Sequence, residues 1–336
     1  YLYYGTGLSE DDLRQMNVAG TCHHVAYPSY GIGWPGESAL RIRHADGVIA
    51  TRLYVQDVEV RQEPDAMLTL VKLKDCVYPF YVNLCYKAYR DVDVIETWTE
   101  FSHSEKTPVT LLQFASSYLP LRRGDVWLSS LYGGWGNEAR LLQEPLKPGI
   151  RLIKNIDGVR NSHTAHAEVM FSLDGKPQEN TGRTIGAALC YTGDYRLKIN
   201  TDDGDYHHFF AGMDEEGASF RLKKGEVFRT PPLALTYSEE GLGGASRNFH
   251  KWGRKHKLAN GDKPRKILLN SWEGVYFDIN QKDMEQMMAD IALMGGELFV
   301  MDDGWFGDKH PRDIDNAGLG DWVVCLLYTS PSPRDS

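Results

Sequence analysis

Hydrophobic and polar residues alternate along much of the chain between about residues 40 and 237. In 195–201, Tyr, Leu, Ile and Thr alternate with Arg, Lys and Asn, which is the period of a half-buried strand. Strand-forming residues also crowd 78–89 and 92–101, and turn sequences such as 203–205 (Asp-Gly-Asp) separate such stretches. Many short strands without intervening helices predict a β-sandwich of two large sheets.

The hydrophobic period changes after Ser238. Leu242, Ala245, Phe249 and Trp252 recur at steps of three and four residues, which indicates a helix. The next stretch, 255–265, is basic and polar and contains both Gly and Pro. We therefore expect a boundary between two domains at this place.

A different rhythm follows in 267–301. The apolar run 267–272 and the second run 298–301 are typical of strands buried on both faces, as in a parallel sheet. Between them, Asn280 is a plausible N-cap of a helix that ends at a Gly-Gly pair. The order predicts a β-α-β unit of a β/α barrel. A dinucleotide-binding fold is not expected, because no glycine-rich loop follows the first strand.

Composition excludes several classes of protein. The chain has 336 residues, of which 42% are hydrophobic and 25% charged, as in ordinary globular proteins. The net charge of −9 would repel phosphate groups, so we expect no nucleic-acid partner. No apolar run reaches the length of a membrane span, so no membrane insertion is expected.

A metal site is not expected either. The five cysteines are scattered and form no C-x-x-C pair. The adjacent pairs His23-His24 and His207-His208 cannot readily share an ion, because neighbouring residues of a strand point to opposite faces. We expect these histidines at the surface or in turns.

Two adjacent carboxylates, Asp302 and Asp303, follow the second buried run. In a β/α barrel the carboxyl ends of the strands form the active-site face. Two ionised carboxylates repel each other unless donors surround them, and sugar hydroxyls are such donors. Trp272, at the end of the neighbouring strand, could supply an apolar face for a sugar ring. An ordinary acidic loop with a helix-capping aspartate stays an alternative.

The motifs around these residues resemble glycoside hydrolase family 36, the microbial α-galactosidases. The most specific is Asp-Asp-Gly-Trp-Phe-Gly at 302–307, and the resemblance extends from about Tyr27 to Trp322. The other similar segments are Tyr-Pro-Ser-Tyr-Gly at 27–31, Gly-Glu-Val-Phe at 225–228, Ser-Arg-Asn-Phe-His at 246–250, Asn-Ser-Trp-Glu at 270–273, Tyr-Phe-Asp at 276–278 and Gly-Leu-Gly-Asp-Trp at 318–322.

The resemblance implies a multidomain β plus α/β fold: a β-supersandwich followed by the first units of a (β/α)8 barrel. We expect the supersandwich over 1–240, a helical linker over 241–264 and the start of the catalytic barrel over 265–324. The last residues, 325–336, look unlike the family and are left out of this assignment. Because the sequence begins without Met, we also expect a truncated fragment, whose compartment, cytoplasmic or periplasmic, stays open.

The family's binding residues map onto this sequence one by one. The resemblance implies that Asp302 and Asp303 bind galactose hydroxyls and that Trp272 lines the same subsite. A tryptophan of the sandwich reaches a neighbouring subunit's pocket in the family's tetramers, and Trp135 is the best match, although a hairpin or core role is an equal alternative. At the position where many members carry a sugar-binding Asp, this chain has Trp34, which could stack on an aglycone or pack against its own loop.

The family retains anomeric configuration and needs no cofactor, only two carboxylates and water. Its nucleophile lies in a Lys-Trp-Asp motif on the fourth barrel strand and its acid/base on the sixth, and this sequence contains neither. We therefore predict an α-galactosidase fragment that is itself inactive. Other readings stay open: an α-N-acetylgalactosaminidase, a galactosyl transferase such as raffinose synthase, or a non-catalytic carbohydrate-binding module.

Overall fold

The computed structural model divides into two compact units, Tyr1–Gly261 and Asp262–Ser336. The residues that the structure describes are 25–31, 36–121, 123–158, 164–217 and 219–324.

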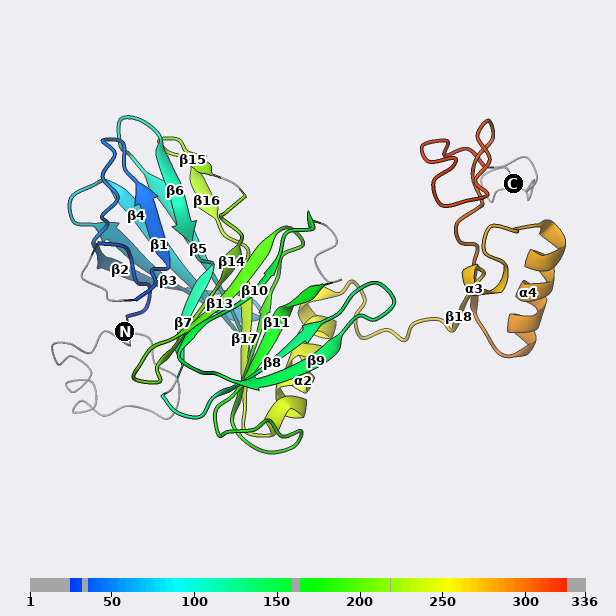
Figure 1. Cartoon of the computed structure of the whole chain (residues 1–336), viewed down its shortest axis with the longest axis horizontal. Coiled ribbons are helices and arrows are strands. Elements are labelled where there is room, and N and C mark those ends of the chain that lie inside the picture. The colour runs from blue at the N-terminus through cyan, green and yellow to red at the C-terminus, as the bar shows by residue number, and fades with distance from the viewer. Residues whose placement is uncertain (1–24, 32–35, 122, 159–163, 218, 325–336) are drawn as a thin grey trace. The chain divides into compact units, whose positions relative to one another are not determined.

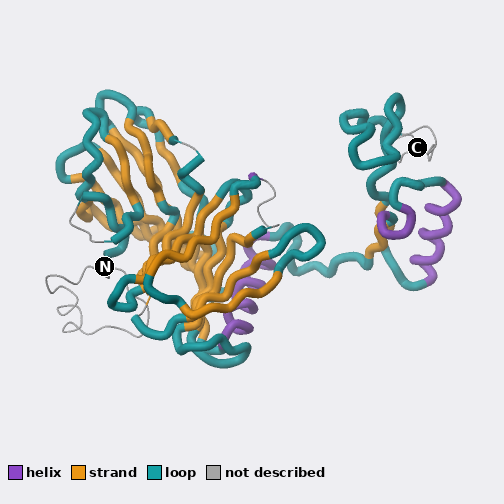
Figure 2. The backbone as a smooth tube through the Cα atoms, in the orientation of Figure 1, coloured by secondary structure: helices purple, strands orange, loops and turns teal. Residues whose placement is uncertain are grey.

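The first unit is built on one large antiparallel sheet (Figures 1 and 2). Its strands follow the order β2-β3-β4-β5-β17-β12-β11-β8-β9, and β16 pairs with β5 beside that path. Their bounds are β2 Leu53–Gln62, β3 Ala66–Asp75, β4 Phe80–Tyr89, β5 Val94–His103, β8 Trp127–Tyr132, β9 Arg140–Pro145, β11 Ala165–Ser172, β12 Thr184–Leu189, β16 Val227–Arg229 and β17 Leu233–Ser238.

Two smaller antiparallel sheets complete the sandwich. One has the order β1-β6-β15 and the other the order β10-β13-β14-β7. Their bounds are β1 Leu40–Arg43, β6 Val109–Phe114, β7 Ser117–Leu121, β10 Gly149–Asn155, β13 Tyr195–Thr201, β14 His207–Met213 and β15 Phe220–Leu222. The alternating stretch 195–201 is β13, as predicted. The predicted β-sandwich is confirmed.

Each small sheet closes a hydrophobic core of its own against the large sheet. Phe80, Phe101 and Phe114 join β4, β5 and β6 in one core. In the other core, Phe171 of β11 packs edge-on against Phe209 of β14, with ring centroids 5.0 Å apart. The two cores explain why alternating strands succeed each other without helices, because most strands turn one face to a core.

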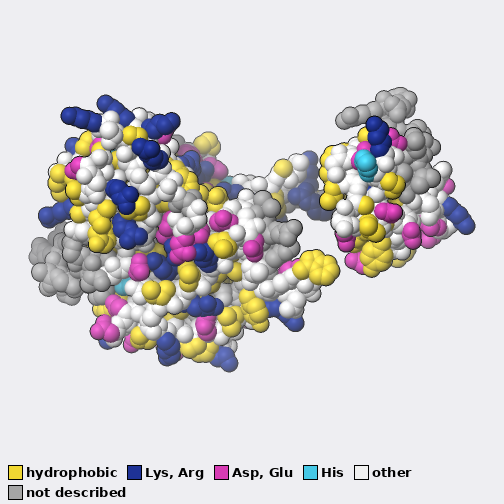
Figure 3. All heavy atoms as spheres, turned by 45° about the horizontal axis from the view of Figure 1, so that its top comes forward, with side chains coloured by type: hydrophobic (Ala, Val, Ile, Leu, Met, Phe, Trp, Pro, Cys, Tyr) yellow, Lys and Arg dark blue, Asp and Glu magenta, His cyan; other side chains and the backbone are white. Residues whose placement is uncertain are grey.

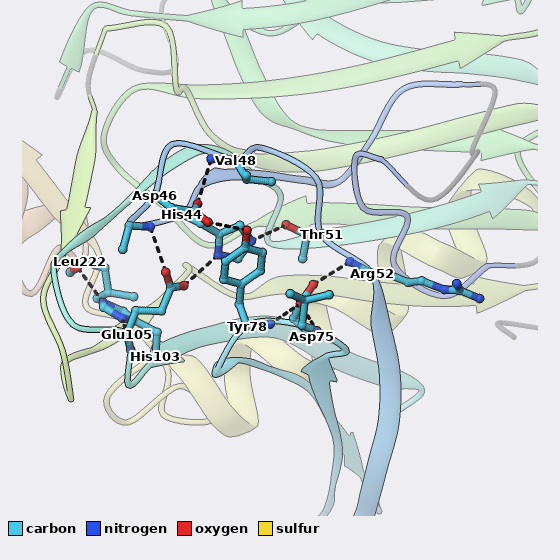
Figure 4. Close-up of polar contacts among 12 residues, drawn as sticks. His44, Asp46, Val48, Thr51, Arg52, Asp75, Tyr78, His103, Glu105 and Leu222 are labelled. Atoms are coloured by element: carbon cyan, nitrogen blue, oxygen red, sulfur yellow. Dashed lines mark hydrogen bonds and ion pairs between the residues drawn. The ribbon is translucent and has the colours of Figure 1, made fainter.

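A buried polar network joins the β1 end to the β3–β4 turn (Figure 4). The His44 ring stacks on Tyr78 and lies 2.8 Å, through Nδ1, from Oε1 of Glu105. Its Nε2 lies 3.3 Å from the Thr51 hydroxyl, and the second Glu105 oxygen accepts the backbone N–H of Ala45 at 2.9 Å. Because these groups satisfy one another, the His44–Glu105 pair is held with almost no contact to solvent.

Helix α2, Gly241–Trp252, covers the large sheet on the side away from the two cores. It continues as a π-helix, η3, Gly253–Lys257. Ala234 of β17 and Val94 of β5 are buried against Trp252. The helix that we predicted as part of a linker over 241–264 thus packs on the sandwich, and the division between the units falls after Gly261.

The second unit contains one β-α-β motif. Strands β18, Leu268–Asn270, and β19, Leu298–Val300, pair in parallel. The short helix α3, Trp272–Val275, and helix α4, Gln281–Leu293, lie between them in sequence. Asn280 caps α4 as predicted, because its side chain accepts the backbone N–H of Asp283 at 3.0 Å. This motif confirms the start of an α/β barrel, and no closed barrel forms among the described residues.

Two expectations about burial differ from the structure. Leu268 and Leu298, predicted to be buried on both strand faces, are 49% and 40% exposed, because no described residue covers the second face of this two-stranded sheet. The expectation of surface or turn histidines is wrong for His207 and His208, which are buried in β14. The Thr201 hydroxyl lies 2.9 Å from His207 and the Tyr118 hydroxyl 2.8 Å from His208, so both rings have polar partners.

Candidate functional site

The candidate site lies at the carboxyl ends of β18 and β19. The parallel register pairs Asn270 with Val300, so the residues that follow both strands meet at the same edge. Trp272 follows β18, and Asp302 and Asp303 follow β19. The structure thus brings together three of the five residues that the sequence selected.

Asp302 is anchored to the neighbouring strand. The Asn270 side-chain amide donates to its Oδ2 at 2.6 Å, and the Asp302 backbone N–H donates to the Ser271 hydroxyl at 3.0 Å. Ser271 is fully buried, whereas Asp302 is half-buried. The Asp302 carboxylate is therefore fixed in direction but still reaches solvent.

Asp303 is held by a basic side chain from the following loop. Arg312 donates from Nε to Oδ1 at 2.9 Å and from Nη2 to Oδ2 at 2.6 Å. Its remaining nitrogen, Nη1, donates to the carbonyls of Ile314, Asp315 and Ala317. The hydrogen bonds from Arg312 lower the pKa of Asp303 below its ordinary value of 3.8, so this carboxylate is ionised at neutral pH.

Aromatic rings surround these charges. Trp272 makes edge contacts with Tyr276 and Phe277, at centroid distances of 5.3 and 4.9 Å. The guanidinium of Arg312 lies 5.3 Å from the Phe277 ring centroid and 5.6 Å from that of Phe306. The site therefore combines fixed acceptors with apolar walls, an arrangement that suits a neutral ligand carrying both hydroxyls and an apolar face.

Glycines shape the loop that carries the pair. Gly304 has a φ of 104° and Gly307 a φ of 107°, which are conformations that other residues rarely adopt. A Cβ at Gly307 would also lie 2.6 Å from the carbonyl oxygen of His310. Further along the loop, the Asp321 carboxylate accepts the backbone N–H groups of Lys309 and His310, which lowers its pKa. The backbone geometry of the loop thus requires glycine at two positions of the 302–307 motif.

Family models match nearly the whole chain. The "Glycosyl hydrolase family 36 N-terminal domain" matches residues 1–223, and "Melibiase" matches residues 227–328. This chain belongs to glycoside hydrolase family 36. The resemblance inferred from the motifs is confirmed.

Curated relatives in the family are α-galactosidases. The chain is 33% identical over 315 residues to Alpha-galactosidase C of Emericella nidulans. The alignment covers 88% of this chain and 42% of that protein. The chain is 31% identical over 268 residues to Alpha-galactosidase AgaA of Geobacillus stearothermophilus, covering 79% and 36%. The chain thus spans about two fifths of the length of these relatives.

Solved structures of family 36 enzymes share the fold. The structure superposes on AgaA of Geobacillus stearothermophilus with a TM-score of 0.82 and 27% identity, covering 89% of this chain and 43% of that one. The galactosidase domain of the α-galactosidase–sucrose kinase AgaSK gives the same TM-score at 29% identity, with the same coverage. Variants of AgaA, 28% identical to this chain, have been solved with stachyose and with raffinose.

The other selected residues lie elsewhere. Trp135 sits in the β8–β9 hairpin of the sandwich and is 88% exposed, so it has no core role. Trp34 lies outside the described residues, as do His23, His24 and the tail from residue 325.

Sequence reasoning missed the two side chains that hold the carboxylates. Asn270 belongs to a quoted motif, but nothing in the sequence joined it to Asp302, 32 residues away. Arg312 follows a proline in a polar stretch, and only the folded loop shows that it faces Asp303.

Among the described residues no group of three or more His, Cys, Asp and Glu side chains could hold a metal ion. Nor does any helix in those residues have the length and apolar character needed to cross a membrane. On the face drawn in Figure 3, basic and acidic side chains are interspersed over the sandwich rather than gathered by sign.

Proposed function

We propose that the complete protein containing this chain is a retaining α-galactosidase that releases terminal α-linked galactose from oligosaccharides such as melibiose and raffinose. Family membership supports this proposal, as do the names of the curated relatives. The observation that carries it is the adjacent pair Asp302-Asp303, fixed by Asn270 and Arg312 at the carboxyl ends of two parallel strands.

In this proposal the two aspartates hold the sugar. The two carboxylates belong to adjacent residues of one turn, so each can accept hydroxyls from a different part of one ring. Trp272 supplies an apolar wall for the ring's C–H face. Because Arg312 keeps Asp303 ionised, this residue is suited to binding and not to proton donation.

Bond cleavage is assigned to other residues. By resemblance to the family, the nucleophile and the acid/base lie on later barrel strands, in a Lys-Trp-Asp motif and beyond. The 336-residue chain is therefore expected to bind galactosides without hydrolysing them. Incubating the purified chain with p-nitrophenyl α-galactoside tests this directly, and release of nitrophenol above the blank would contradict it.

Trp135 is proposed to act between subunits. Its indole is exposed on a hairpin tip, where neither core uses it. By resemblance, such a tryptophan completes the pocket of a neighbouring subunit in a homo-oligomer, a tetramer in the family.

The proposal is tested in the complete enzyme. We expect p-nitrophenyl α-galactoside to be cleaved, and Asp302→Asn and Asp303→Asn each to lower kcat/KM by about two orders of magnitude or more, because charged hydrogen bonds to the sugar are lost. Asp313→Asn, at an exposed carboxylate of the same loop, serves as the control and should keep full activity. Preference for the α-N-acetylgalactosaminide, or transfer to a sugar acceptor in place of hydrolysis, would assign the protein to another activity of the family.

A further inference from the structure

The sandwich contains a cavity of about 490 Å³, far larger than any packing defect. It lies on the inner face of the large sheet, against residues of β4, β5, β12 and β17, and is bounded on the other side by β7. Tyr118 and Leu119 of β7 belong to different hydrophobic cores, so the cavity lies where the two cores meet. Helix α2 packs on the opposite face of the same sheet, where it contacts Val94.

The walls are apolar and largely uncharged. Among the described residues that line the cavity, four are tyrosines and only Asp93 carries a charge. Asp93 is exposed, so it stands at the rim. With no lysine, arginine or histidine among these lining residues, the cavity does not suit a phosphate or a carboxylate.

One part of the cavity is lined by hydroxyls that lack protein partners. Thr97 is 3% exposed and Ser117 7% exposed, yet the hydroxyl of neither makes a hydrogen bond within the part of the chain that the structure describes. Burial raises the pKa of the neighbouring Tyr86 to about 12, so its hydroxyl stays protonated and can donate.

A small adjoining hollow extends the same pattern. It shares Tyr86, Thr97, Ser117 and Tyr118 with the cavity and is also lined by Ser116. The hydroxyl oxygen of Ser116 is buried without a hydrogen-bond partner in the described residues. Buried polar groups are normally satisfied, so the Ser116 hydroxyl, beside those of Thr97 and Ser117, forms a cluster of polar groups available to a ligand.

We propose that this cavity is a second, non-catalytic binding site for an uncharged pyranose, separate from the Asp302-Asp303 pair. Tyrosine rings and Leu235 would cover the C–H faces of the sugar, and Thr97, Ser117 and Tyr86 would exchange hydrogen bonds with its hydroxyls. This binding involves no bond cleavage.

The experiment is ligand-observed saturation-transfer NMR of the 336-residue chain, titrated with D-galactose and D-glucose. We expect saturable binding of at least one sugar. Thr97→Val and Ser117→Ala, combined, should weaken it at least about fivefold, because each removes one hydroxyl and little volume. Tyr86→Phe should weaken it by a smaller factor. Thr110→Val, at a half-buried threonine of β6 that does not line the cavity, is the matched control and should leave binding unchanged.

A further variant distinguishes binding at the cavity from binding at the Asp302-Asp303 pair. Asp302→Asn with Asp303→Asn should leave the cavity's binding curve intact, so failure of the proposed function would not affect this result. Binding that disappears in that variant and persists in Thr97→Val with Ser117→Ala would overturn the proposal. So would the absence of any saturable signal, or displacement of a bound apolar dye with no response to sugar, which would assign the cavity to an apolar ligand.

Discussion

Arg312 donates to both carboxylate oxygens of Asp303, at 2.9 Å from Nε and 2.6 Å from Nη2. The same guanidinium is buried and bonded to three loop carbonyls, so it cannot leave the carboxylate without dismantling the loop. The charge of Asp303 and the shape of the loop are therefore determined by one side chain.

This relationship predicts a shift in pH dependence. Arg312→Gln in the complete enzyme removes the hydrogen bonds that lower the pKa of Asp303, so its carboxyl should protonate at higher pH. We expect the acid limb of the kcat/KM profile to move upward, with a loss of about tenfold or more at neutral pH. The kcat/KM of Arg312→Lys should lie between those of the unmodified enzyme and Arg312→Gln, since an ammonium keeps the charge but not the bidentate geometry.

The same pair contributes to stability with a defined sign. Because the pKa of Asp303 is lowered on folding, the contribution is present above the ordinary value of 3.8 and is lost as pH falls through the folded-state value. The melting temperature of Arg312→Gln should be lower than that of the unmodified enzyme at neutral pH. The difference should narrow in strong acid but not vanish, because the bonds to the three loop carbonyls are lost at every pH. Arg254→Gln, at an exposed residue of η3, is the control. An unchanged acid limb would contradict the role given to Arg312.

The sequence was informative where local patterns decide the structure. The alternation of hydrophobic and polar residues predicted strand β13, and Asn280 predicted the start of helix α4. Both predictions were possible because strand period and helix capping depend on a few adjacent residues. The pair Asp302-Asp303 and Trp272 could be selected because both follow apolar runs in the sequence. The partners Asn270 and Arg312 could not, since their contacts depend on the register of β18 with β19 and on the path of a glycine-containing loop.

The contact between Asn270 and Asp302 gives a further prediction. Its amide donates to the carboxylate at 2.6 Å. Asn270→Asp replaces this donor by a second anion of nearly the same shape, so the two carboxylates repel each other. We expect kcat/KM of the complete enzyme to fall further for Asn270→Asp than for Asn270→Ala. Steady-state kinetics on p-nitrophenyl α-galactoside measures both, and equal losses would show that the contact is only steric.

Trp135 allows a test of assembly. The indole is exposed, so Trp135→Ala should change the free energy of unfolding of the 336-residue chain by no more than about 0.5 kcal/mol. In the complete enzyme the same change should raise KM or shift the oligomer distribution measured by light scattering. Tyr132→Ala, half-exposed in the same hairpin, is the control. Unaltered kinetics and assembly would remove Trp135 from the proposed site.

The buried pair His44–Glu105 predicts a position where substitution strongly destabilises the sandwich. The two side chains are 0% and 4% exposed, and Glu105 also accepts the Ala45 N–H. Glu105→Ala leaves the imidazole and that N–H without acceptors, so we expect a loss of about 3 kcal/mol in the free energy of unfolding, measured by urea titration of the 336-residue chain. A less buried pair, His166–Glu168, whose side chains are 16% and 48% exposed, gives the control: Glu168→Ala should cost no more than about 0.5 kcal/mol. Equal costs for the two variants would show that the buried pair adds nothing beyond a surface contact.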